Sequence, residues 1–271
     1  MSAPVTLATI TLRENRMRTY PLVLASWLCM AWMSPALAQQ KTFTVGVEDL
    51  EYYPQKSHKN GQFIGFGREL LDAFAKSKGY KFEYKILPLN RLFLENLKDQ
   101  TLDFQYPDNG YWEAHLRKGV TIHYSKPVMP YIDGVMVLPE NKGRGMKDFK
   151  VLGTMTGFTP WNYLDLIKQK RVTVFENDSF LALLKQVSLK RVDGAYINVE
   201  VAKYQLREVL HQPDSLVFDP ALPHTKDFYY FSTVKHPKVI QEFNAFLASE
   251  VALYEQLRKK LGIESSIHSS R

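Results

Sequence analysis

Cysteine is almost absent from this sequence. The single cysteine among 271 residues, Cys29, lies in an apolar run near the start. Disulfides, thiol nucleophiles and zinc–thiolate sites are therefore excluded from the rest of the chain. The seven histidines include no i, i+4 pair and no H-E-x-x-H motif, and no G-x-S-x-G occurs. We therefore expect no metal ion, no cofactor and no catalytic residue of these types.

Long apolar runs are also missing, apart from Tyr20–Met33. This run is short of the roughly 20 residues that span a bilayer. Arginines precede it, and the small-x-small sequence Ala36–Ala38 follows it. This layout predicts a secretory signal peptide over residues 1–38, with an N-terminal membrane anchor as the alternative. An exported chain without disulfides suits the bacterial periplasm, which is the predicted location.

A strong excess of one charge is missing as well. Without residues 1–38, the chain keeps 32 Lys and Arg (35 less three arginines) and 27 Asp and Glu (28 less Glu14). The net charge of +5 is mild and spread out. The basic clusters Lys168–Arg171 and Arg258–Lys260 lie at predicted helix ends, where cations are favourable. We therefore expect no nucleic-acid partner.

The first half of the chain alternates strand and helix patterns. Polar and apolar residues alternate over Thr42–Val47 and Lys81–Ile86, which predicts two strands, and Leu102–Phe104 predicts a short third. Helical patterns lie between them, over Arg68–Ala75 and Arg91–Leu97. A β-α-β-α-β order with short links predicts an α/β fold with a largely parallel sheet.

The pattern then restarts over Val151–Val209, a second unit of about the same size, and two further helices close the chain. We expect two lobes, joined by two crossing segments at Asp133–Asn141 and Asp219–Phe231. The predicted first lobe comprises residues 39–136 and 230–263, and the second comprises 137–229, followed by a frayed tail over 264–271. Two lobes that face each other with the carboxyl ends of their strands form a cleft.

One segment of the second unit carries a polar turn at a strand end. In Thr154–Trp161 a strand is followed by hydroxyl groups, a glycine and a proline. Free backbone N–H groups at such a helix start favour an anion, and ordinary helix capping explains the same residues. The glycines Gly65 and Gly67 lack the third glycine of a dinucleotide site, so a tight turn explains them.

Three longer stretches together resemble a known family. They are GVEDLEYYP…NGQFIGFGRELLDAF, VLGTMTGFTPW with the later RVDGAYIN, and FNAFLASEVALYEQLRKKLGI. In order and spacing they resemble the extracellular solute-binding proteins of family 3, which serve polar amino acid ABC transporters. The resemblance implies a two-lobe periplasmic-binding-protein type 2 fold, with two mixed sheets flanked by helices and joined by two crossing strands.

The resemblance also implies a ligand site at the strand ends of both lobes. The side chains that would line it follow the first and third strands of each lobe, and Arg91 would open the helix after the second strand of the first lobe. The predicted ligand-binding residues are Glu48, Tyr52, Tyr53, Arg91, Tyr106, Asp108, Asn109, Trp112, Arg117, Thr156, Gly157, Phe158 and Asn198. For Arg91, a plain surface position is the alternative.

Two positions depart from the family pattern. Where the family carries a threonine and a carboxylate-gripping arginine, this chain has Gln105–Asn109, with Arg117 following. Where the family offers an aspartate to the ligand ammonium, this chain has Asn198, which cannot pair a cation with full charge. Both departures argue against an ordinary α-amino acid as the ligand.

The resemblance predicts a periplasmic receptor without catalysis. It would capture a small polar or anionic ligand by hinge closure and present it to an ABC permease or a membrane sensor, and we expect a monomer. One alternative is a dehydratase-like enzyme of the same fold, acting on a cyclic carboxylic acid. Another is a degenerate binding lobe that serves only as a protein partner.

Overall fold

The computed structural model of the chain describes residues 40–263. The predicted signal peptide and the predicted tail over 264–271 lie outside these residues. Within residues 40–263, no helix combines the length and the apolar character that a membrane crossing needs.

The first lobe is built around three parallel strands. β1 (Thr42–Glu48) lies between β4 (Lys81–Leu87) and β5 (Phe104–Asp108). The alternating apolar residues of β1 face a core of aromatic rings. Helices α1 (Phe66–Lys78), α7 (Pro237–Ser249) and α8 (Val251–Lys260) add their apolar faces to this core.

The second lobe repeats this plan. β8 (Val151–Met155) pairs in parallel with β9 (Thr173–Asn177) and β10 (Gly194–Asn198). Three helices accompany these strands: α4 (Leu164–Lys168), α5 (Phe180–Ser188) and α6 (Val199–Tyr204). A 3-10 turn, η2 (Trp161–Tyr163), precedes α4, and a π-helical turn, η3 (Gln205–Val209), continues α6.

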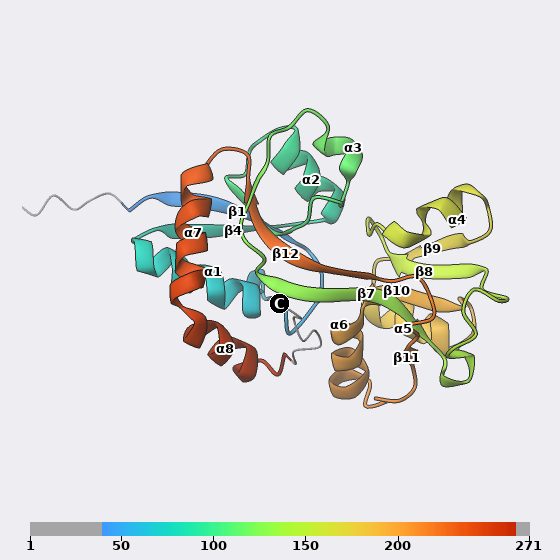
Figure 1. Cartoon of the computed structure of the whole chain (residues 1–271). Coiled ribbons are helices and arrows are strands. Elements are labelled where there is room, and N and C mark those ends of the chain that lie inside the picture. Colours follow the sequence, from blue (N-terminus) through green and yellow to red (C-terminus); the bar gives the residue numbers. More distant parts are fainter. Residues whose placement is uncertain (1–39, 264–271) are drawn as a thin grey trace, which may run out of the picture. The chain divides into compact units, whose positions relative to one another are not determined.

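Two long antiparallel strands connect the lobes. β7 (Met129–Val137) pairs with β10 of the second lobe, whereas β12 (Thr225–Thr233) pairs with β5 of the first. The two also pair with each other, so the strand order runs continuously as β4-β1-β5-β12-β7-β10-β8-β9. Figure 1 shows both strands running from one lobe into the other.

Smaller elements fill the connections. In the first lobe these are the hairpin of β2 (Ser57–Lys59) and β3 (Gln62–Ile64), then α2 (Leu89–Leu97), α3 (Ala114–Arg117) and β6 (His123–Tyr124). In the second lobe they are η1 (Pro139–Asn141) and β11 (Val217–Phe218).

The predicted fold class is confirmed, with one shift that affects the site. The predicted third strand, Leu102–Phe104, begins at Phe104 and extends to Asp108, so Gln105–Asp108 form a buried strand rather than a loop. Pro107 lies opposite a register irregularity between Tyr230 and Ser232 of β12. A proline lacks the N–H that a regular ladder needs, and it is tolerated at such a bulge.

Candidate functional site

A buried ion pair lies at the carboxyl end of β1. Glu48 ends this strand, and Lys56, in the segment leading to β2, donates a hydrogen bond from Nζ to Oε2 of Glu48. Only 2–3% of either side chain is exposed. Burial raises the pKa of Glu48 and lowers that of Lys56, because it disfavours both charged forms, while the mutual attraction acts in the opposite direction.

A second carboxyl group, Asp133 of β7, lies close to this pair. It is buried and interacts electrostatically with both Lys56 and Glu48. Burial raises the pKa of Asp133 to about 7. Within residues 40–263, its Oδ1 atom makes no hydrogen bond of normal geometry, and neither does the hydroxyl of the fully buried Tyr52, although Asn198 faces the Asp133 carboxyl with its side chain and Tyr52 with its backbone. Most buried polar atoms in proteins are paired, so these two mark a place suited to a water molecule or a ligand group.

Tyrosine rings surround the lysine. Nζ of Lys56 lies over the ring of Tyr52, 5.0 Å from its centroid, and over the ring of Tyr229, 5.3 Å away. Tyr229 in turn stacks on Tyr131 at 4.5 Å and receives a 3.1 Å hydrogen bond from Nδ2 of Asn198. We call Lys56, Glu48, Asp133, Tyr52 and Tyr229 the lysine cluster. It draws on β1, both crossing strands and the segment before β2.

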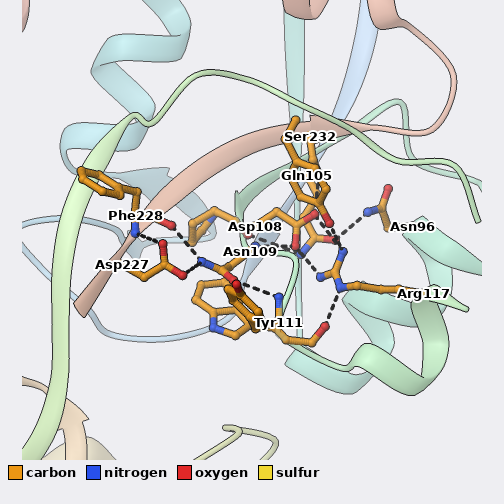
Figure 2. A network of polar contacts seen from close by, with 12 residues as sticks. Asn96, Gln105, Asp108, Asn109, Tyr111, Arg117, Asp227, Phe228 and Ser232 are labelled. Atoms are coloured by element: carbon orange, nitrogen blue, oxygen red, sulfur yellow. Dashed lines mark hydrogen bonds and ion pairs between the residues drawn. The ribbon is translucent and has the colours of Figure 1, made fainter. Parts of the chain in front are cut away.

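A second buried network surrounds Asp108 at the end of β5 (Figure 2). The guanidinium of Arg117 in α3 binds both carboxylate oxygens of Asp108, with the shorter contact at 2.5 Å, and Ser232 Oγ donates a 2.6 Å hydrogen bond. Arg117 also donates to the hydroxyl of Tyr124 at 2.8 Å and to the carbonyl oxygen of Trp112. Burial alone would lower the pKa of Arg117, but Asp108 holds it above its ordinary value. These residues form the Asp108 network.

Asn109 continues this network toward the crossing strand β12. Its Nδ2 atom donates to Oδ2 of Asp227 at 2.9 Å and to the carbonyl oxygen of Phe228 at 3.1 Å, while its Oδ1 accepts from the backbone of Tyr111. Figure 2 shows this side chain between Asp227 and the Asp108 network. The turn after β5 is therefore bound to the strand that joins the lobes.

A cleft of about 540 Å³ lies between the lobes. Its first-lobe wall follows β1 and includes the start of α2, and its second-lobe wall includes the end of β8 and the start of α5. The lining residues are Asp49, Leu50, Glu51, His58, Pro88, Leu89, Asn90, Met155, Thr156, Asp178, Ser179 and Phe180. Backbone N–H groups at the two helix starts favour an anionic group, and the three carboxylates favour a cationic one.

The two lobes contact each other beside this cleft. Gly157, with φ of 78°, lies so close to the first lobe that a Cβ atom there would be 3.2 Å from Leu89 and from Asn90. Phe158 follows, with its ring centroid 6.1 Å from that of Tyr52. Trp112 lines a small hollow together with Gly157 and Phe158.

The structure brings most of the predicted ligand-binding residues to this junction. Glu48 and Tyr52 belong to the lysine cluster, and Asn198 contacts it through Tyr229. Asp108, Asn109, Trp112 and Arg117 take part in the Asp108 network. Thr156, Gly157 and Phe158 lie at the cleft or beside it. Their role toward a ligand stays a prediction.

Three predicted residues lie elsewhere. The side chain of Arg91 is 67% exposed and pairs with Glu95 one helical turn later. Tyr106 is buried in the core of the first lobe, where it occupies the space beside Gly67. Tyr53 packs its ring against Tyr204 of α6. None of the three belongs to the lysine cluster or lines the cleft.

The residues that the sequence did not point to are Lys56, Asp133, Tyr131 and Tyr229. Lys56 lies in the polar segment before β2, where the sequence predicts a solvated side chain. Asp133 was missed because its partners are distant in sequence. The one available signal for Asp133 was its charge within β7, a strand that is otherwise largely apolar. Within residues 40–263, no group of three or more His, Cys, Asp or Glu side chains is arranged to hold a metal ion.

Comparisons with known proteins bear on the fold. No protein-family model matches the sequence, and no curated protein matches it. Several solved structures are similar. The arginine-, lysine-, histidine-binding protein ArtJ of Geobacillus stearothermophilus is 19% identical, with a TM-score of 0.66, and the match covers 83% of this chain and 97% of that one.

Two further structures have the same architecture. A histidine kinase sensor domain with similarity to periplasmic binding proteins is 19% identical, with a TM-score of 0.66, covering 82% of this chain and 96% of that one. The ancestral amino acid-binding protein AncCDT-1, a precursor of cyclohexadienyl dehydratase, is 20% identical, with a TM-score of 0.63, covering 81% of this chain and 95% of that one. The chain therefore has the two-lobe fold of the periplasmic binding proteins.

Proposed function

We propose that the chain is a solute-binding receptor that captures a small polar ligand between its lobes by hinge closure. The observation that carries this proposal is the cleft of about 540 Å³, because its walls come from both lobes. A ligand that contacts both walls stabilises the closed arrangement over the open one by its differential affinity. The volume is within the usual range of small-molecule sites.

The chemistry of the cleft supports a ligand with more than one polar group. The starts of α2 and α5 suit an anionic group, and Asp49, Glu51 and Asp178 suit an amine or a guanidinium. Asp49 has His58 Nε2 at 2.8 Å, but an anionic ligand without a cationic group would still approach Glu51 and Asp178 without compensation. We therefore favour a zwitterionic or cationic small molecule within the broader class of polar or anionic ligands.

The setting of this receptor belongs to the same proposal. The signal peptide over residues 1–38 would direct it to the periplasm, where it would act as a monomer. The lobes would comprise residues 39–136 with 230–263, and 137–229. Its partner would be an ABC permease or a membrane sensor, since similar structures include an ABC transporter receptor with bound histidine and a histidine kinase sensor domain.

A thermal-shift screen tests the proposal. The purified protein is heated with amino acids, polyamines, carboxylic acids and cyclic acids in turn. A ligand at about 100 times its Kd adds about 2.7 kcal/mol to the free energy of unfolding. If no compound of the panel raises Tm, the receptor proposal fails.

A pair of variants locates the binding. Thr156→Trp places a large side chain on the second-lobe wall of the cleft, and we expect it to abolish the ligand-induced rise in Tm. Thr173→Trp is the matched control, because Thr173 is also an exposed threonine, lies at the start of β9 and does not line the cleft. Equal loss of binding in both variants would contradict the location.

The proposal includes no catalysis. Asp133, whose pKa of about 7 would suit acid–base chemistry, does not line the cleft. Incubation with cyclic carboxylic acids, followed by product analysis, is the corresponding test. Turnover of any of them would favour the dehydratase-like alternative.

A further inference from the structure

The lysine cluster combines three features around one ammonium group. A carboxylate, Glu48, binds Nζ of Lys56 directly, and a second carboxyl group, Asp133, interacts with its charge. The rings of Tyr52 and Tyr229 face the same nitrogen at 5.0 and 5.3 Å from their centroids. Aromatic faces with nearby carboxylates are the groups with which proteins bind free ammonium ligands.

The parts of this enclosure come from separate elements of the fold. Glu48 ends β1, Asp133 belongs to β7, and Tyr229 belongs to β12, so both crossing strands take part. Lys56 enters from a segment outside these three strands and ends among them, with 3% of its side chain exposed. Three of the enclosing side chains thus come from long strands of the fold, while Tyr52 comes from the same connection as Lys56, whose backbone N–H donates to the carbonyl oxygen of Tyr52 at 3.0 Å.

The enclosure also has polar atoms that Lys56 leaves unpaired. Within the described part of the chain, Oδ1 of Asp133 and the hydroxyl of Tyr52 make no hydrogen bond of normal geometry, although both residues are buried. A salt bridge that served only to link Lys56 to Glu48 would not need these groups around it. A site shaped to accept an ammonium group with more than one donated hydrogen bond would use them.

We propose that the lysine cluster is a binding site for a primary ammonium group, and that the side chain of Lys56 is its built-in occupant. The site is separate from the proposed ligand cleft, because none of its five residues lines that cleft. Removing the side chain of Lys56 beyond Cβ would open the site to a free primary alkylammonium ion. While Lys56 is in place, such ions are excluded from it.

Chemical rescue tests this proposal. In Lys56→Ala, n-propylammonium has the same three carbons and nitrogen that the substitution removes. We expect Lys56→Ala to melt below the wild type, and n-propylammonium to raise its Tm in a saturable way, by roughly 5 °C at about 100 times its Kd. The neutral analogue n-propanol measures the effect of filling the cavity alone, and we expect it to raise Tm much less.

Three controls make the result specific. The wild type should show no saturable rise with n-propylammonium, because its site is occupied. Lys85→Ala removes another lysine that pairs with a glutamate, Glu95, but Lys85 is 45% exposed, and no rescue is expected there. Lys56→Met fills the site with an apolar chain of similar length, and no rescue is expected there either.

Equal responses of Lys56→Ala to n-propylammonium and n-propanol would overturn the proposal. If Lys56→Ala does not fold alone, refolding from urea with each additive gives the same comparison. Recovery of folded protein with the amine alone supports the site, and recovery with both or with neither contradicts it. The ligand screen of the wild type is a separate measurement, so failure of the receptor proposal and failure of the ammonium site are distinguishable.

Discussion

The Asp108 network and the lysine cluster are two buried ionic groups that differ in how fully their polar atoms are hydrogen-bonded. Asp108 accepts hydrogen bonds from Arg117 and from Ser232, and Arg117 has further acceptors in Trp112 and Tyr124. In the lysine cluster, by contrast, Oδ1 of Asp133 and the hydroxyl of Tyr52 make no hydrogen bond of normal geometry among the described residues. A fully hydrogen-bonded buried network rigidifies the structure, whereas a buried polar atom without a partner is costly and can be satisfied by a water molecule or a ligand group. The contrast supports a scaffold role for the Asp108 network and the binding role proposed above for the lysine cluster.

The largest effect should come from breaking the complete network. Arg117→Met leaves the fully buried Asp108 without its counter-charge, and such a loss typically costs about 3–5 kcal/mol of the free energy of unfolding. Arg91→Met is the matched control, because Arg91 also pairs with a carboxylate, that of Glu95, but is exposed, and it should cost less than about 1 kcal/mol. Urea unfolding measures both, and similar costs would contradict the contrast.

The next effect is a dependence of stability on pH. The pKa of Asp133 is about 7 in the folded protein, and the ordinary value is 3.8, so the folded state holds this proton more tightly than the unfolded state. Stability from this group is therefore fully present below about pH 4 and is lost as the pH rises to about 7.

The corresponding variant is Asp133→Asn. At roughly 1.4 kcal/mol for each pKa unit, the loss between pH 4 and pH 7 should be about 3 kcal/mol smaller in Asp133→Asn than in the wild type. Urea unfolding at both pH values gives this difference. Groups that do not interact with Asp133 are common to both proteins and cancel, whereas Glu48 and Lys56 titrate together with it, so the difference reports the coupled cluster. Identical pH profiles would show that Asp133 does not titrate as described.

A smaller effect should follow from removing the charge of Lys56. Lys56→Met strands Glu48, but burial already raises the pKa of Glu48, so this carboxyl can take up a proton and limit the cost to about 2 kcal/mol at neutral pH. Adding Glu48→Gln should recover most of that loss. If Lys56→Met costs as much as Arg117→Met and the double variant does not recover, the lysine cluster has the same scaffold role as the Asp108 network.

The smallest effect concerns an exposed contact between the lobes. Tyr111, after β5, has its ring centroid 5.5 Å from that of Trp161 in η2, and both side chains are exposed. Tyr111→Ala should cost about 0.5–1.5 kcal/mol, the usual range for an aromatic pair. Leu189→Ala, at another exposed apolar position, should cost less. Equal costs would show that the ring contact adds no stability.

The fold was predictable because its signals are local. The alternation of Thr42–Val47 and the apolar face of α1 are visible in short windows, and the repeated β-α order implies two lobes. The extension of β5 through Pro107 was missed, since proline usually ends a strand and the irregularity in β12 that accommodates it is more than 100 residues away.

The site was predictable only as a region. The strand ends identified Glu48, Asp108 and Asn198, but the sequence could not show that Arg117 is neutralised by Asp108, because the turn between them decides it. Lys56 was missed for the same kind of reason. Its burial depends on residues that β7 and β12 bring to the end of β1, and no short window contains them.

The position of the aromatic residues around the lobe junction has an optical consequence. Of the four tryptophans in the sequence, two precede residue 39, and the other two are Trp112, in the first lobe, and Trp161, in the second. Trp112 lies beside Gly157 and Phe158 of the opposite lobe, and Trp161 lies beside Tyr111. Each indole therefore has neighbours across the junction, so opening of the lobes should change its emission, and the protein carries its own unlabelled fluorescent reporter of closure.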